Sequence, residues 1–390
     1  MTLQLTEQPG RDLAVVAADT AARTLAEHAD QVDRDGVFPQ ASVAALARTG
    51  LLNAVLPHHL GGMGLNTAVL AEVARTLGRA CGSTAMIWTM HQVQLACVAR
   101  HLDAADAASA ELLSSIVARN GLIASVTSEL GVGGNLRESR VACDREGNRT
   151  SFVKKAPTIS YGLMADAFLI TARRNEEAAA GDQVLVLASA DQVELHDVGE
   201  WDVMGMRGTR SPGCRISVDV PSTQVLSTPF AEVAAHTMVP LSHILWSAAW
   251  IGIAEEAARR ATRRLRQAGR LGSSGTAPDL RLASVGQRLD ALNGLLQSVI
   301  RGYEQLDDSR TDVVTSDFAV EVNSLKLAAS TETVEIAETA LEICGMQGYQ
   351  ERSAHSVARM LRDLYSARLM ISNSRLQETN ATAMLMRRYG

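Results

Sequence analysis

The spacing of apolar residues changes twice along the chain, and this change restricts the possible folds more than any other feature. From about residue 12 to 120, apolar residues recur at steps of three and four, as in TAVLAEVARTLGRA, which predicts amphipathic helices. Between about 122 and 220, short runs such as AFLITARR and VLVLASA alternate with Gly, Asn and Pro, which predicts strands. From about 240 onward, long helical patterns return.

The two changes of pattern predict three regions. We expect an N-terminal helical domain over 1–121, a middle β domain over 122–226 and a C-terminal helical domain over 227–390. The long helical stretches of the last region predict a four-helix bundle. The segment DREGNRT predicts a hairpin turn between two strands. The expected fold class is therefore α+β, mostly α, with a β-barrel or sandwich in the middle.

Composition limits the classes of partner. The formal charge of -6 and the scattered Arg residues give no basic patch, so we expect neither nucleic acid nor a membrane surface as partner. The N-terminus has no basic stretch before an apolar core, and no window holds 18 uninterrupted apolar residues, so we expect a cytoplasmic location. The five cysteines form no CxxC or Cys/His spacing, so no metal site is expected.

Five segments stand in a suggestive order: FPQASVAALARTGLLNAVLPHHLGGMGLN, SVTSELGVGGN, KKAPTISYG, WDVMGMRGT and CGMQGYQERSAHSVARMLRD. Together they resemble the acyl-CoA dehydrogenase superfamily over nearly the whole chain. The fourth is a close match, and the fifth is similar to the family's Gly-Gly-x-Gly-Tyr segment and the Arg-Asp helix after it. The resemblance implies the three-region fold above and FAD as cofactor. It also implies a homodimer or homotetramer, because FAD sites in this family are completed across an interface.

A flavin ring requires hydrogen-bonding groups along one edge and flat packing on its faces. In the family, hydroxyl groups and backbone amides of the second and third segments contact the ring edge. The resemblance places Ser160 near the reactive N5, and Thr158 at a position where the family usually has Trp. The flavin contacts that it implies fall on Thr127, Ser128, Thr158, Ser160, Gly345 and Asn373.

The catalytic base of the family is missing. An acyl-CoA dehydrogenase needs a carboxylate near the α carbon of its substrate, and the family places a Glu about eight residues after the Arg-Asp pair. Counted from Arg362 and Asp363, this position falls on Ile371. The alternative location used by some members falls near His243, again without a carboxylate. Glu378, about two helical turns beyond Ile371, would serve only if the local alignment is shifted.

This absence leaves three functions open. The first is α,β-dehydrogenation of an acyl thioester, on CoA or a carrier protein, with His243, Glu378 or an unidentified base and a separate electron acceptor. The second is a flavin-dependent monooxygenase of the same fold, in which externally reduced flavin reacts with oxygen and His91, His243 and Ser160 serve near N5. The third is a non-catalytic homologue. Because WDVMGMRGT and CGMQGY are nearer to the dehydrogenases, the sequence favours the first.

Overall fold

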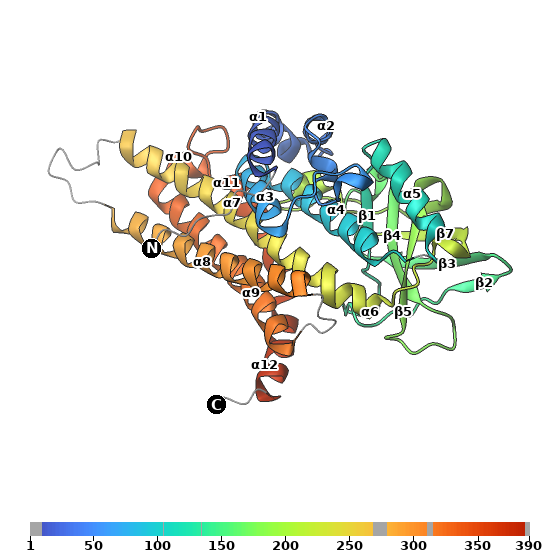
Figure 1. Ribbon diagram of the computed structural model, residues 1–390. Helices are drawn as coiled ribbons and strands as arrows, with labels where there is room; N and C mark the ends of the chain where they lie inside the picture. The colour runs from blue at the N-terminus through green and yellow to red at the C-terminus, as the bar shows by residue number, and fades with distance from the viewer. Residues whose placement is uncertain (1–9, 104, 134, 268–278, 310–314, 387–390) are drawn as a thin grey trace.

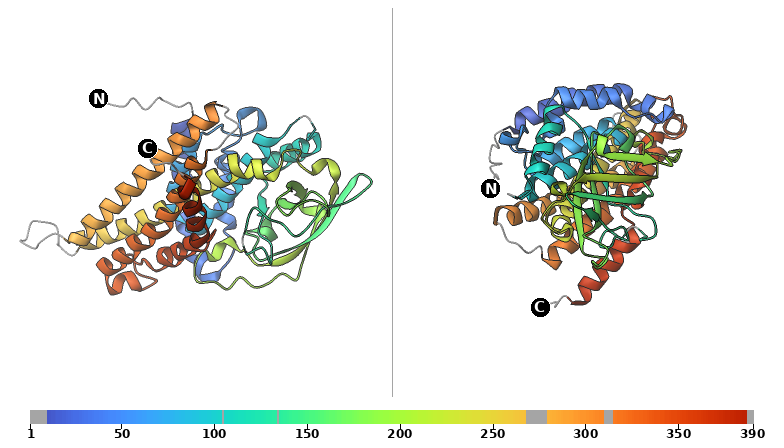
Figure 2. Two further views of the ribbon diagram at one scale, coloured as in Figure 1. Left: turned by 90° about the horizontal axis from the view of Figure 1, so that it is seen from below. Right: turned by 90° about the vertical axis from the view of Figure 1, so that its right-hand side faces the viewer.

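The computed structural model describes residues 10–103, 105–133, 135–267, 279–309 and 315–386. An N-terminal set of helices is followed by a β region and then by a C-terminal helical bundle (Figure 1). Seen from its right-hand side, the β region lies in front of the two helical parts (Figure 2). The predicted order helix, β, helix is confirmed, and so is the α+β, mostly α fold class.

Among the N-terminal helices, α3 packs against both α1 and α4, and α4 is buried on almost every side. One face of the neighbouring helix α3 carries apolar residues at helical spacing, and this face is buried. It includes Val69, Val73 and Leu77. The side chains of α4 are buried over nearly its whole length, and some of its polar groups find partners inside the protein: Gln92 Oε1 accepts a hydrogen bond from the amide of Val55 at 3.0 Å. The helices are α1 (Arg11–Asp35), α2 (Gln40–Arg48), α3 (Thr67–Ala80), α4 (Gly82–His101) and α5 (Ala107–Ala118).

The β region contains two sheets in the described part of the chain. One has the order β1-β4-β5, with β1 parallel to β4, and the other is antiparallel with the order β2-β3-β7-β6. The predicted hairpin lies between β2 and β3, where Glu146 pairs with Arg149. The strands are β1 (Ile123–Val126), β2 (Asp144–Glu146), β3 (Arg149–Ala156), β4 (Ala167–Arg173), β5 (Gln183–Ser189), β6 (Val193–His196) and β7 (Cys214–Pro221).

Helix α7 (Val239–Gln267) is the central element of the bundle, since it packs against both α3 and α9 (Ser316–Cys344). It follows the short α6 (Phe230–Val233) and a π-helical turn, and α8 (Leu280–Ser309) lies alongside α9. The span Phe230–Gln267 is long and apolar enough to cross a membrane, but 89% of its most apolar window is buried in the protein. Burial of this kind is typical of a core helix.

The last helical stretch of the bundle is divided. After α10 (Met346–Tyr349), the chain forms α11 (Ala358–Tyr365) and α12 (Asn373–Met386), with a turn between them. Ile371 lies in this turn with a φ of 53°, in the left-handed region that a β-branched residue rarely adopts. The left-handed backbone ends the helical path, so α12 extends away from the rest of the bundle (Figure 1).

Candidate functional site

Two of the predicted flavin-binding segments meet at the end of β1. Thr127 and Ser128 follow this strand, and the Ser128 hydroxyl donates a hydrogen bond to the carbonyl oxygen of Thr158 at 2.9 Å. Tyr161, with a φ of 46°, turns the chain so that its hydroxyl donates to the carbonyl oxygen of Ile123 at 3.0 Å. These hydrogen bonds hold SVTSEL and KKAPTISYG side by side.

A chain of three hydroxyl groups ends at Ser160. Ser211 Oγ lies 2.9 Å from Ser160 Oγ and 2.9 Å from Thr209 Oγ1. Thr209 Oγ1 in turn lies 2.9 Å from the carbonyl oxygen of Met206. Thr209 and Ser211 are buried and Ser160 is half-buried, so the chain leads from the core of WDVMGMRGT to a hydroxyl that contacts solvent. Connected hydroxyls of this kind fix each other's orientation.

The loop after β1 is fixed by a buried ion pair. Glu129 accepts hydrogen bonds from the Ser139 hydroxyl at 2.7 Å and from the next two backbone amides at 3.0 and 3.1 Å. Lys154 Nζ lies 3.9 Å from Glu129 Oε2 and donates to the carbonyl oxygen of Val126 at 3.1 Å. Burial lowers the pKa of Lys154 to about 8, although the Glu129 charge opposes this shift. The pair therefore supports the backbone that carries Thr127 and Ser128.

The Arg-Asp pair of α11 ties three parts of the chain together. Asp363 Oδ1 accepts a hydrogen bond from the amide of Met206 at 2.6 Å. The Arg362 guanidinium binds both carboxylate oxygens of Asp33, at 2.9 and 2.5 Å, and the carbonyl oxygen of Met204 at 3.0 Å. The pair thus joins α11 to the end of α1 and to WDVMGMRGT, which is a structural role.

On the bundle side, a buried lysine of α9 holds the turn between α11 and α12. Lys326 Nζ donates to the carbonyl oxygen of Ile371 and to Asn373 Oδ1, both at 2.7 Å. Asn373 Nδ2 donates to Ser330 Oγ at 3.0 Å. Burial lowers the pKa of Lys326 to about 8. Lys326 falls at a core position of an apolar helical pattern. This feature of the sequence could have identified it.

The turn and the loop after β1 lie next to each other. A Cβ atom added to Gly133 would lie 3.5 Å from Nη2 of Arg375, two residues after Asn373. The Arg375 side chain is half-buried and has no hydrogen-bond or ion-pair partner among the described residues. The Arg375 side chain therefore links the start of α12 to the loop after β1.

His243, a predicted catalytic residue, lies on α7 close to Lys326. Its side chain is fully buried, and neither ring nitrogen has a hydrogen-bond partner within the described residues. Burial and the nearby Lys326 charge lower the pKa of His243 to about 3. The ring is therefore neutral at physiological pH and is a weak base.

His91, the other predicted histidine, lies at the opposite end of β1 from Thr127. Its Nδ1 accepts a hydrogen bond from the amide of Ile123 at 3.1 Å, and the side chain is fully buried. Burial lowers its pKa to about 4. In this position His91 joins α4 to the start of β1, and a role at the flavin remains a prediction.

Three further predicted residues lie at the surface. Glu378 is exposed on α12, outside the group formed by Lys326 and the turn. Gly345 ends α9 with a φ of 60° and has open space where a Cβ would stand, which would allow close approach of another molecule. Thr158 is also exposed. Their functional roles stay predictions.

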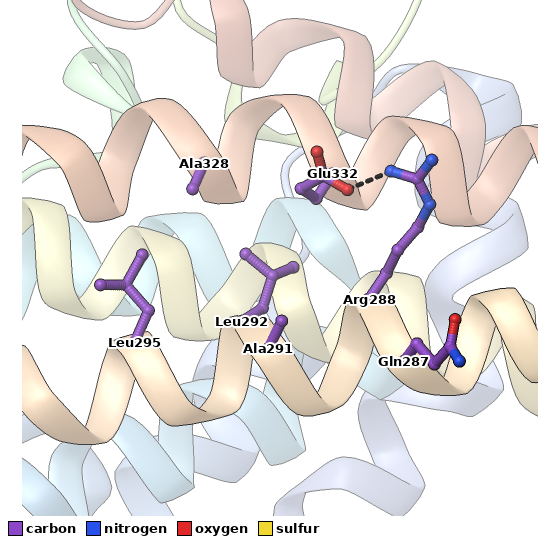
Figure 3. A pocket seen from close by; sticks show the side chains of 7 residues that line it. All are labelled: Gln287, Arg288, Ala291, Leu292, Leu295, Ala328 and Glu332. Carbon is purple, nitrogen blue, oxygen red and sulfur yellow. Dashed lines mark hydrogen bonds and ion pairs between the residues drawn. The ribbon is translucent and has the colours of Figure 1, made fainter.

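A groove of about 280 Å³ between α8 and α9 contains none of the predicted site residues (Figure 3). Its floor is apolar, and Arg288 and Glu332 form an ion pair at one end. The side chains that line it are Gln287, Arg288, Ala291, Leu292, Leu295, Ala328 and Glu332.

The groups at the end of β1 fit a flavin. Within the described residues, the Thr127 hydroxyl has no hydrogen bond, and the half-buried Ser160 hydroxyl bonds only Ser211. Both therefore retain hydrogen-bonding capacity for the edge of a ring with alternating donors and acceptors. The unpaired Arg375 guanidinium suits a phosphate group of such a cofactor.

Comparisons with known proteins agree with the fold. Residues 10–130 match the family model "Acyl-CoA dehydrogenase, N-terminal domain", and residues 233–372 match "Acyl-CoA dehydrogenase, C-terminal domain". Cyclohex-1-ene-1-carbonyl-CoA dehydrogenase of Geobacter metallireducens is 25% identical, over 92% of this chain and 93% of that protein. The amino sugar nitrososynthase DnmZ of Streptomyces peucetius is also 25% identical, over 87% and 84%.

Among solved structures, FMN-bound TdsC from Paenibacillus sp. A11-2 superposes with a TM-score of 0.83 at 21% identity, covering 97% of this chain and 98% of that one. Another structure of TdsC describes it as a dibenzothiophene monooxygenase. At this identity the likeness concerns the fold alone. The similar proteins thus include a CoA-thioester dehydrogenase, an amino sugar nitrososynthase and a monooxygenase.

Proposed function

The chain belongs to the acyl-CoA dehydrogenase superfamily, and from this premise we propose that it is a flavin-dependent monooxygenase that requires no carboxylate base. Its relatives include flavin oxidoreductases and nitrososynthases, so the cofactor class is a flavin. We propose FAD as the flavin, on the basis of the resemblance.

The observation that carries the proposal is the turn at Ile371. Removal of an α proton requires a basic group within hydrogen-bond reach of the substrate carbon. At this position the chain has an aliphatic side chain, and its backbone carbonyl is bonded to Lys326. The second family location, near His243, offers a buried imidazole whose pKa is lowered to about 3. Both positions are therefore poorly suited to proton abstraction.

The remaining parts of the site suit a reaction with reduced flavin. When bound, the flavin supplies the electrons with which oxygen is activated. The Ser160 hydroxyl, oriented by Ser211 and Thr209, would donate or accept a hydrogen bond at the ring edge. The name of TdsC describes a monooxygenase of this fold, and this similarity supports the proposal.

A thioester dehydrogenase is the second candidate, because a cyclohexenecarbonyl-CoA dehydrogenase matches 92% of the chain. In that case the base would be His243, Glu378 or a group not yet identified, and the buried ring of His243 would be a weak base because its pKa is lowered to about 3. Such a base would have to become accessible to the substrate. The substrate would be an acyl thioester of CoA or of a carrier protein.

The proposal is tested by the reaction of the bound flavin with oxygen. Protein loaded with FAD, and separately with FMN, is reduced under anaerobic conditions and mixed rapidly with oxygenated buffer while flavin absorbance is followed. We expect oxygen to consume the reduced flavin within seconds, at a rate proportional to oxygen concentration. Reduced flavin that persists for minutes would contradict the proposal and favour the dehydrogenase.

A further inference from the structure

Lys326 is a buried amine without a carboxylate partner in the described part of the chain. Its side chain is fully buried on α9, and its hydrogen bonds go to the carbonyl oxygen of Ile371 and to Asn373 Oδ1. Burial of an amine is costly unless each of its hydrogen bonds is made. A lysine in such a place therefore requires a compensating structural or functional role.

The backbone that Lys326 bonds is itself strained. Ile371 has a φ of 53°, and a β-branched residue is strained in this region and persists there only where its surroundings enforce it. The enforcing contacts lie on one helix: Lys326 bonds the carbonyl of the strained residue, and Ser330, one helical turn further on, bonds the side chain of Asn373. Both acceptors of Lys326 thus belong to the same short turn.

The turn has a defined neighbour across the site. Arg375, at the start of α12, lies 3.5 Å from the position that a Cβ of Gly133 would occupy, in the loop that follows β1. A movement of residues 371–373 would also move Arg375, which lies two residues further along the chain. The conformation of the turn therefore affects how the start of α12 meets the loop after β1.

We propose that Lys326 is a positioning residue that holds the turn Ile371–Asn373 in its left-handed conformation and so fixes the bundle side of the flavin site. The first part concerns the protein without ligand. The second part rests on the proposed function, because it assumes that a flavin binds between the turn and the loop after β1.

The first part is tested by limited proteolysis of ligand-free protein. Arg368 and Arg375 flank the turn, so trypsin cleavage at these two residues reports its order. We expect Lys326→Met to be cleaved there at least tenfold faster than the unchanged protein. Glu321→Gln, at an exposed position of the same helix, is the matched control and should be cleaved at the original rate. Unchanged cleavage in folded Lys326→Met would overturn the proposal.

A milder variant covers the case in which Lys326→Met does not fold. Asn373→Ala removes one acceptor of Lys326 and the bond to Ser330, but leaves the amine in place. We expect cleavage at Arg368 and Arg375 to rise several-fold in this variant, and unchanged cleavage would overturn the positioning role in the same way.

The second part is tested by flavin affinity, measured as quenching of flavin fluorescence. We expect folded Lys326→Met, or Ser330→Ala if Lys326→Met does not fold, to bind FAD more weakly than Glu321→Gln, by about tenfold for Lys326→Met, and neither residue is a predicted flavin contact. Faster cleavage with unchanged FAD affinity would overturn only the flavin-site part. Because neither readout depends on turnover, an error in the assigned reaction would leave both results unaffected.

Discussion

At the scale of single residues, the site depends on hydroxyl groups whose partners are distant in the sequence. Ser211 is 51 positions from Ser160, yet their oxygens lie 2.9 Å apart. The motif that resembles the family pointed to Ser160, but nothing in the local pattern indicated Ser211. The same is true of Lys326 and Ile371, which are 45 positions apart. Motifs therefore predicted the groups at the ring edge, whereas their supporting partners required the fold.

Ser211→Ala should weaken flavin binding several-fold. The change removes one hydrogen bond of the chain, worth about 1 kcal/mol, and leaves the Ser160 hydroxyl free to rotate. Flavin fluorescence titration measures the affinity. Ser217→Ala, on β7 and without a side-chain hydrogen bond among the described residues, is the control. Equal affinities for the two variants would show that the hydroxyl chain does not reach the flavin.

Asp363 should give the protein a pH-dependent stability. Burial raises its pKa to about 6, although Arg359 and the Met206 amide oppose the shift. The folded state therefore holds this proton to higher pH than the unfolded state. The stability that it contributes is fully present below the unfolded pKa and is lost as pH rises through about 6.

Comparison with Asp363→Asn isolates this effect. From about pH 4 to about pH 7, the free energy of unfolding of the unchanged protein should fall relative to the variant by on the order of 2 kcal/mol. Urea denaturation at several pH values measures the difference. A difference that is constant over this range, or that grows with pH, would contradict the raised pKa.

At the scale of elements, α3 and α7 cross with their backbones in near contact. A Cβ atom on Gly252 would lie 2.1 Å from the carbonyl oxygen of Arg75, and one on Gly78 would lie 2.3 Å from that of Ala249. Gly252→Ala should therefore destabilise the protein by about 1–3 kcal/mol, because the two helices must separate.

Gly286 of α8 is the matched control, since a Cβ there meets no atom within 4 Å. Gly286→Ala should stabilise the protein by up to about 1 kcal/mol, because alanine favours the helix. Thermal unfolding followed by circular dichroism measures both variants. Similar melting temperatures for Gly252→Ala and Gly286→Ala would mean that the backbones of α3 and α7 are further apart than described.

The sequence predicted well those elements whose bounds depend on local residue patterns. It predicted less well those elements whose bounds depend on tertiary contacts. The hairpin at DREGNRT and the apolar strands β4 and β5 follow from turn residues and burial. The division of the last helical stretch does not, because LYSARLMISNS contains neither Gly nor Pro. The break at Ile371 is enforced by Lys326 from another helix.

At the scale of the whole molecule, α12 extends from the bundle and exposes apolar side chains near its end. Leu385 is 89% exposed and Met386 is 74% exposed. Exposed apolar groups on a projecting helix are typical of an interaction surface. We therefore expect self-association, in line with the homodimer or homotetramer that the family resemblance implies.

Leu385→Glu should shift this association toward the monomer, because the interface would have to bury a carboxylate. Sedimentation velocity measures the molecular mass in solution. Val16→Glu, at another exposed apolar position that lies on α1, should leave the assembly unchanged. A monomeric unchanged protein, or equal effects of the two variants, would contradict the role of α12.

We propose that the reaction does not depend on α-proton abstraction, because the family resemblance places Ile371 where other members carry a carboxylate. The most direct test of this proposal is an anaerobic titration of flavin-loaded protein with short and medium acyl-CoA thioesters, comparing the unchanged protein with Ile371→Glu. We predict that the absorbance of oxidised flavin persists in the unchanged protein and is bleached in Ile371→Glu, where a base is restored. Bleaching of the unchanged protein by any thioester would contradict the claim and identify a dehydrogenase with another base.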